Sequence, residues 1–146
     1  MANYAASDAI LPEMGIRHIS ASEAWAMLEE ISNTKSVAGT TLVDVRTPQE
    51  WERGVPDLSM LHNKNTLLQL SWRTLPAMEI NPAFGKDFSA RAAERETPLL
   101  FLCKAGGRSF EAACAMSAIG YTQCYNIIGG FEDEAGWKAT PLPWRK

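Results

Sequence analysis

The chain has 146 residues, of which 46% are apolar, and 14 Lys and Arg against 17 Asp and Glu give a formal net charge of −3. This length and balance are typical of one globular domain, which we assign to 16–146, after a flexible leader over 1–15. Because the basic residues are scattered rather than gathered into a stripe, nucleic acid is not expected as a partner.

Apolar runs and cysteine spacing indicate the compartment. Residues 1–15 lack a basic opening followed by an apolar core, and no apolar run reaches the roughly 18 residues of a membrane helix. We therefore expect a cytoplasmic protein with no membrane partner. Three widely spaced cysteines and two histidines predict neither a disulfide framework nor a metal site, and we expect no cofactor.

The first predicted elements are a helix, a strand and a second, shorter helix. Ser20 and Glu23 form a capping-box pattern before apolar residues at helical spacing, which predicts a helix over 21–32. The run TLVDV at 41–45 is typical of a strand buried on both faces. A threonine-proline pair then predicts a short helix over 48–52.

The middle of the chain is the least regular part. Residues 59–62 fit a short strand, and 67–72 fit either a strand or a loop. Asn81 before a proline predicts a capped helix that runs to about Arg95.

Strands and helices alternate in the second half. The predicted elements there are a strand over 99–102, a helix over 109–119, a strand over 124–128 and a short helix over 131–138. A tail with Pro141, Pro143 and Trp144 is expected to extend along the body. This alternation predicts an α/β fold, with an open, mainly parallel sheet of about five strands and helices on both faces. Ligands of such sheets bind beyond the carboxyl ends of the strands.

Cys103 follows the apolar strand LLFL and opens the segment CKAGGRS before the next helix. Backbone N–H groups and the positive end of the helix dipole converge at such a junction, which favours a thiolate over a thiol. The glycine pair lets the amides point inward as a nest for an anion, while Lys104 and Arg108 add positive charge. The segment has no histidine, so electrostatics rather than a neighbouring base would activate the thiol. The alternative is an ordinary glycine turn around a buried cysteine.

This segment resembles the active-site loop of the rhodanese family, whose pattern is a cysteine, four residues and often an arginine. LVDVR at 42–46 followed by Glu50 is similar to the family's early strand, and NIIGGF at 126–131 with Trp137 is similar to its late strand and glycine turn. The chain departs from many relatives at 54–57, where it has GVPD in place of a glycine-histidine-isoleucine-proline-glycine segment.

The resemblance implies a rhodanese-like fold and specific roles for these residues. Cys103 would be the catalytic nucleophile that carries a sulfane sulfur as a persulfide. The binding loop would consist of Lys104, Ala105, Gly106, Gly107, Arg108 and Ser109. Arg108 would bind the anionic donor or order the loop. Asp44, Arg46 and Glu50 would support the site, with an exposed ion pair expected between Arg46 and Glu50.

Other candidates are interpreted as structural. Cys114 and Cys124 fit small buried hydrophobes better than resolving thiols. His18 and His62 fit hydrogen-bonding residues at the ends of elements, and Trp72 is expected either in the core or at the rim of the pocket.

Three functions remain open from the sequence. The first is a sulfurtransferase that moves sulfur from thiosulfate or another persulfide to a thiol, cyanide or a protein. The second is a persulfide carrier for a partner protein. The third is a cysteine-dependent phosphatase or arsenate reductase of related fold, whose loop would be one residue longer than the four residues found here between Cys103 and Arg108.

Overall fold

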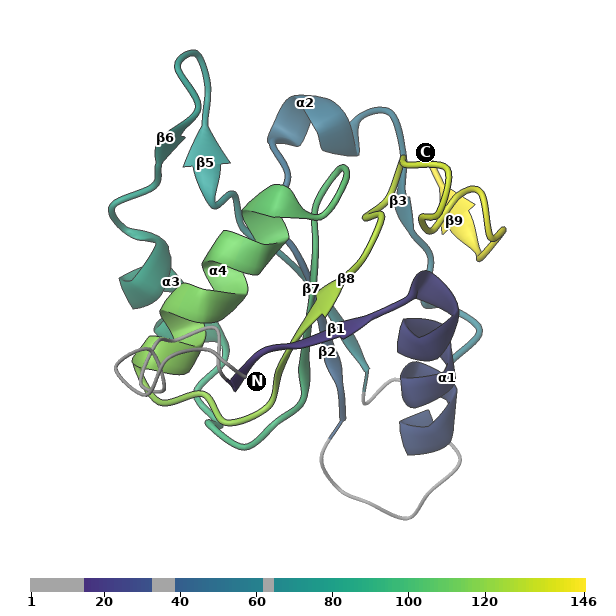
Figure 1. Cartoon of the computed structure of the whole chain (residues 1–146), viewed down its shortest axis with the longest axis horizontal. Helices are drawn as coiled ribbons and strands as arrows, with labels where there is room; N and C mark the ends of the chain where they lie inside the picture. Colours follow the sequence, from purple (N-terminus) through teal and green to yellow (C-terminus); the bar gives the residue numbers. More distant parts are fainter. Residues whose placement is uncertain (1–14, 33–38, 62–64) are drawn as a thin grey trace, which may run out of the picture.

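A computed structural model of the chain describes residues 15–32, 39–61 and 65–146. Its centre is a five-stranded sheet in the order β1-β8-β7-β2-β4, in which all neighbouring strands are parallel (Figure 1). The strands are β1 (Arg17–Ile19), β2 (Thr41–Asp44), β4 (Thr66–Gln69), β7 (Leu99–Leu102) and β8 (Cys124–Ile127). The predicted α/β fold with an open parallel sheet is confirmed.

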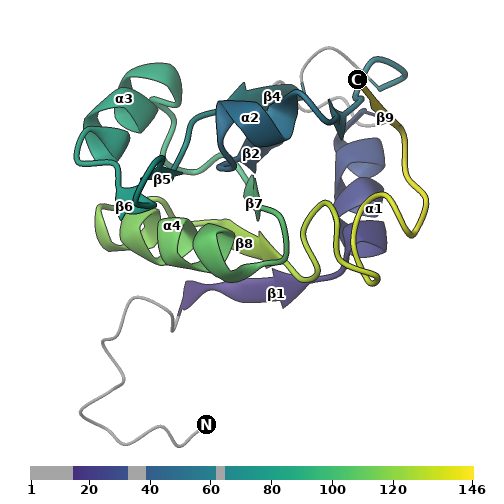
Figure 2. The same ribbon diagram turned by 90° about the horizontal axis from the view of Figure 1, so that it is seen from above.

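Helices cover both faces of this sheet. Helix α1 (Ala21–Ser32) lies on one face, and α3 (Phe84–Arg91) and α4 (Gly107–Ala118) lie on the other (Figure 2). The central strand β7 is fully buried, with Leu100 and Leu102 in the core on the α1 side and Leu99 and Phe101 in the core on the α4 side. Neither face of such a strand contacts water, which explains why its sequence is wholly apolar.

The first two predicted helices are confirmed. The Glu23 side chain accepts from the Ser20 N–H at 2.8 Å and the Ser20 hydroxyl accepts from the Glu23 N–H at 3.0 Å, which completes the capping box of α1. Helix α2 (Pro48–Trp51) is capped in the same way by Thr47 and Glu50.

Helix α3 is shorter than predicted at both ends. The Asn81 carboxamide accepts from the Ala83 N–H at 3.0 Å and donates to the Ser71 carbonyl at 3.1 Å, so it closes a turn before the helix. At the other end the Ala92 carbonyl accepts from the Tyr121 hydroxyl, which takes the chain out of the helical path.

The prediction of a helix over 131–138 is wrong, because this segment is a series of turns. The N–H groups of Trp137 and Lys138 donate to carbonyls seven residues back, those of Gly130 and Phe131, at 2.8 and 3.1 Å. An α-helix needs bonds to the fourth residue back. The fully buried Trp137 side chain draws the segment onto the α1 side of the sheet.

Several short strands lie outside the central sheet. The C-terminal segment contains β9 (Trp144–Arg145), which pairs antiparallel with β3 (Val55–Pro56). Strands β5 (Arg73–Thr74) and β6 (Glu79–Ile80) form a small hairpin that the sequence did not indicate.

Some predictions remain without a test or are corrected here. The interval 59–61 is turn rather than strand, while His62 and the leader over 1–14 lie outside the described residues. Within the ranges that are described, no helix combines the length and the apolar character needed to cross a bilayer.

Candidate active site

Cys103 lies immediately after β7, at the carboxyl edge of the parallel sheet and just before the N-terminus of α4. Its side chain is 1% exposed, so water reaches the sulfur poorly. Open parallel sheets place their sites at this edge, and the expected location is therefore the one found.

Two groups that can donate a hydrogen bond lie within reach of the Cys103 sulfur. The Gly106 N–H donates to Sγ at 3.0 Å, and the Ser109 hydroxyl lies 3.2 Å from the same atom. Gly106 is the N-cap of α4 and has φ of 117°, a backbone conformation that side chains with a Cβ rarely adopt. The helix begins at Gly107, two residues before the predicted start, so the sulfur faces the first turn and its unpaired N–H groups.

The glycine turn after β8 braces the loop that carries Cys103. The Phe131 N–H donates to the Cys103 carbonyl at 2.8 Å, and the Glu132 N–H donates to the Lys104 carbonyl at 3.0 Å. A Cβ at Gly130 would lie 2.6 Å from the Lys104 carbonyl carbon, which is closer than real contacts allow. The close approach of the two backbones therefore requires a glycine at 130. The NIIGGF segment thus packs directly against the CKAGGRS loop.

Arg108 and Glu50 form a two-pronged ion pair. Nη1 of Arg108 lies 2.8 Å from Oε1 of Glu50, and Nη2 lies 2.9 Å from Oε2. Burial of Glu50 alone disfavours its charged form, but hydrogen bonds from Arg108 and Thr47, with the charge of Arg108, outweigh burial and lower its pKa to about 2. The hydrogen bonds that Arg108 donates to Glu50 raise the pKa of Arg108.

The prediction of an ion pair between Arg46 and Glu50 is wrong, because Arg46 pairs with Asp44 and Glu50 pairs with Arg108. Arg46 is fully buried, and its Nε and Nη2 donate to the two carboxylate oxygens of the equally buried Asp44 at 2.9 and 2.8 Å. Its guanidinium also lies 4.2 Å from the centre of the Phe131 ring and donates to the Gly54 carbonyl at 2.9 Å. Arg46 thus connects β2 to the glycine turn that braces the Cys103 loop.

A pocket of about 380 Å³ opens beside this loop. Its lining combines positive, negative and apolar side chains: Thr47, Gln49, Glu50, Arg53, Leu75, Met78, Lys104 and Arg108. Leu75 and Met78 belong to the connection between β5 and β6 and were not anticipated. Trp72 is not at this rim, since it packs edge-on against Phe84 in the core.

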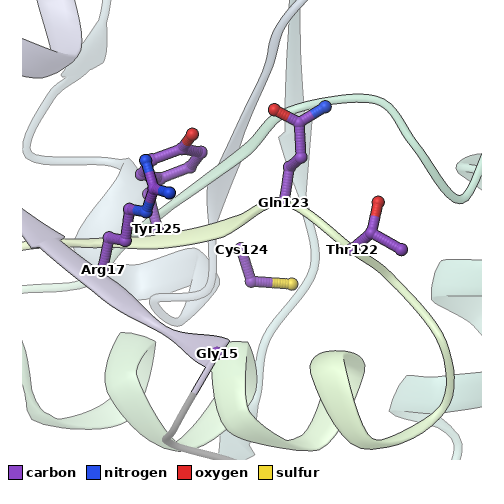
Figure 3. Close-up of a pocket in the computed structure, with 6 residues that line it drawn as sticks. All are labelled: Gly15, Arg17, Thr122, Gln123, Cys124 and Tyr125. Carbon is purple, nitrogen blue, oxygen red and sulfur yellow. The ribbon is translucent and has the colours of Figure 1, made fainter.

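Cys124 is the first residue of β8, in register with Leu99 at the amino end of β7, whereas Cys103 follows the carboxyl end of β7. It lines a separate pocket of about 180 Å³ with Arg17 and Tyr125 (Figure 3). Burial, with a smaller effect of Cys114, raises its pKa to about 12, so its thiol stays protonated near neutral pH. Nowhere in the described ranges do three His, Cys, Asp or Glu side chains gather as metal ligands.

Sequence reasoning missed two polar residues near the sulfur. The Ser109 hydroxyl lies 2.6 Å from Oδ1 of Asn126, and Nδ2 of Asn126 lies 3.3 Å from Nδ1 of His18. Asn126 is 4% exposed within an otherwise apolar strand, and a buried carboxamide in such a run indicates a specific hydrogen-bond partner. His18 was expected as a hydrogen-bonding residue at the end of an element; it does contact Asn126, but it lies in the middle of β1, a strand that was not anticipated.

Comparison with known proteins agrees with this geometry. Residues 20–139 match the family described as Rhodanese-like domain. An uncharacterized protein of Rickettsia rickettsii is 39% identical over 137 residues, which cover 90% of this chain and 99% of that protein. The thiosulfate sulfurtransferase GlpE of Pseudomonas syringae is 32% identical over 95 residues, or 64% of this chain and 71% of that protein. The crystal structure of Rv0390 from M. tuberculosis superposes with a TM-score of 0.74 at 35% identity, covering 88% of this chain and 96% of that one. The chain therefore belongs to the rhodanese-like domain family.

Proposed function

We propose that this protein is a sulfurtransferase in which Cys103 carries the transferred sulfur. The observation that carries the proposal is the Cys103 sulfur at the carboxyl end of β7, which receives the Gly106 N–H at 3.0 Å at the start of α4. A buried sulfur anion needs such donors, because burial by itself favours the neutral thiol.

The reaction is a pair of displacements at sulfur. The Cys103 thiolate attacks the outer sulfur of a donor such as thiosulfate, a new S–S bond forms, and the S–S bond of the donor breaks as sulfite leaves with the electron pair. A thiolate, cyanide or protein thiol then attacks the terminal sulfur of the persulfide, and the Cys103 thiolate leaves. No electrons enter or leave the protein, and the nucleophile is regenerated.

Charge near the loop suits an anionic donor. Lys104 is exposed at the pocket beside the loop. Arg53 lines the same pocket with a side chain 55% exposed, although its Nη2 lies 3.3 Å from a carboxylate oxygen of Glu132. These cations would raise the local concentration of a small dianion. Arg108 is better suited to order the loop, because both of its Nη groups are already paired with Glu50.

The chemistry requires a reduced Cys103, which suits a reducing compartment such as the cytoplasm. The phosphatase reaction receives no support from the site, since it would need the loop arginine on the phosphoryl group. Here that guanidinium is held by a carboxylate.

Turnover of thiosulfate and cyanide to thiocyanate tests the proposal. We expect steady turnover by the native chain and by Cys124→Ser, and none by Cys103→Ser. Uptake of one sulfur without turnover would identify a persulfide carrier instead. Hydrolysis of an aryl phosphate without sulfur uptake would contradict sulfur transfer and favour phosphatase chemistry.

A further inference from the structure

The pocket beside the Cys103 loop has an apolar wall that comes from a different part of the chain. Leu75 and Met78, in the connection between β5 and β6, line it together with Lys104 and Arg108 of the loop. The β5–β6 hairpin and α2 project from the same end of the sheet (Figure 1). A molecule in this pocket can therefore contact both the apolar wall and the loop that carries the nucleophile.

The base of the hairpin is fastened to α4. Nε and Nη2 of Arg73 donate to the two carboxylate oxygens of Glu111 at 2.9 and 3.1 Å, and Nε1 of Trp72 donates to Oε1 of the same residue at 2.8 Å. Residues three apart on a helix are neighbours on its surface, so Glu111 lies beside Arg108. These bonds hold the hairpin next to the part of α4 that lines the pocket.

Met78 has a backbone conformation that favours glycine. Its φ is 55°, in the left-handed region that residues with a Cβ rarely adopt. Nη1 of Arg73 donates to the Met78 carbonyl at 3.0 Å, which helps to hold this conformation. Backbone strain of this kind persists where the surrounding structure imposes it, and it is concentrated at ligand-binding sites. The position of the partly buried methionine side chain at the pocket is consistent with such a use.

Leu75 leaves apolar surface open to the pocket. Leu75 and Ile80 lie on the same hairpin and are equally exposed, at 48% each. Leu75 lines the pocket, whereas Ile80 is outside its lining. A ligand with an apolar group would remove the Leu75 surface from water, which is favourable.

The size and charge of the pocket indicate the kind of occupant. Its volume of about 380 Å³ lies in the range of pockets that hold small organic molecules, about 300 to 1,000 Å³. An inorganic dianion such as thiosulfate has no apolar part to place against Leu75 and Met78. The exposed Lys104 supplies positive charge for an anion at the same pocket. Cys103 is outside the lining, so the pocket suits the part of a donor that does not become attached to the protein.

We propose that Leu75 and Met78 make the site specific for an organic sulfur donor, an anion with a terminal sulfur and an apolar group on the part that leaves. The inference rests on the proposed function, because it assumes that Cys103 takes up sulfur. With an organic thiosulfonate, the Cys103 thiolate attacks the outer sulfur and a new S–S bond forms. The S–S bond of the donor breaks, and the sulfinate with its apolar group leaves with the electron pair.

The test compares benzenethiosulfonate with methanethiosulfonate as donors, with cyanide as acceptor and thiocyanate as the measured product. Both donors carry one negative charge and the same reacting S–S bond, and they differ in the apolar group. The quantity measured is the ratio of their kcat/KM values in each variant relative to the native chain, so the intrinsic reactivity of the donors cancels. Leu75→Ser and Met78→Gly together should lower this ratio about tenfold, as expected for the loss of a methylene-sized contact in an apolar pocket. The loss should appear as a higher KM for benzenethiosulfonate.

Ile80→Ser is the matched control, since it removes an equally exposed apolar side chain from the same hairpin and should keep the native ratio. Leu75→Met keeps an apolar side chain of similar size and should keep it too. Met78→Gly suits a φ of 55°, and Leu75 is half exposed, so the hairpin should persist in these variants.

Two results would overturn the inference while leaving sulfur transfer standing. One is a native ratio in Leu75→Ser and in the double variant, and the other is an equal fall in Leu75→Ser and Ile80→Ser. A native chain that takes sulfur from neither thiosulfonate nor from thiosulfate would overturn both the inference and the proposed function.

Discussion

Replacement of Glu50 by glutamine removes one charge from the ion pair that holds the Cys103 loop. Glu50 has a pKa of about 2 in the folded chain, against an ordinary value of 4.5. At about 1.4 kcal/mol for each pH unit, the ionised carboxylate contributes on the order of 3 kcal/mol to folding. Glu50→Gln should therefore lower the free energy of unfolding by about 3 kcal/mol near neutral pH.

The pH dependence gives the sign of the effect. A carboxyl whose pKa is lowered by folding stabilises the protein fully above its ordinary pKa and loses that contribution as the pH falls toward the folded value. The difference between the native chain and Glu50→Gln should thus shrink from about pH 5 toward about pH 2.

Urea unfolding at neutral pH and at about pH 3 measures both effects. Glu52→Gln is the matched control, since Glu52 caps the same short helix but is exposed. If Glu50→Gln loses no more stability than Glu52→Gln, or loses the same amount at both pH values, the role given to the ion pair is wrong.

Three further predictions concern the surroundings of the loop. Asp44→Asn removes the carboxylate that pairs with the buried Arg46 at 2.8 Å and leaves the longer 3.8 Å contact with Glu132. This change should cost about 3 to 5 kcal/mol in urea unfolding, whereas the exposed Asp87→Asn should cost almost nothing. Equal losses in the two variants would refute the buried pair. Because burial raises the pKa of Cys124 to about 12, iodoacetamide at about pH 8 should spare Cys124 in the folded chain. Labelling of Cys124 as fast in the folded chain as in urea would contradict this assignment. Gly130→Ala places a methyl group against the Lys104 carbonyl and should destabilise the chain by about 3 kcal/mol or more and slow sulfur uptake, so an unperturbed melting temperature would exclude the close approach.

Much of the fold could be predicted because its central elements have strong local signals. The apolar run of β7, the capping box of α1 and the threonine-proline start of α2 depend on neighbours in sequence, and all three are found where expected. The helix over 131–138 failed because the N–H groups of Phe131 and Glu132 bond to the Cys103 loop, which only the tertiary fold brings near. The N–H groups of Trp137 and Lys138 bond to carbonyls seven residues back. The two-residue strands β3, β5, β6 and β9 are too short to carry a periodic pattern.

In the candidate site, too, the residues with local sequence signals could be predicted and the contacts made by tertiary packing could not. Cys103, Gly106 and Ser109 could be placed from one contiguous segment, since strand, loop and helix follow each other directly. The partner of Arg108 could not, because Glu50 of α2 lies 58 residues away in the sequence and meets α4 only in the folded chain. Arg46 pairs with Asp44, two residues away, and what the sequence did not indicate is the burial of both side chains. Asn126 and His18 join the site only through the order of strands in the sheet.

The most direct test of sulfur transfer is the intact mass of the chain after exposure to thiosulfate and removal of the excess. A gain of one sulfur atom, mapped to the peptide with Cys103, released by cyanide and missing in Cys103→Ser, is the result we expect. A chain that keeps its original mass, or that takes up sulfur equally well without the thiol at 103, would contradict the mechanism.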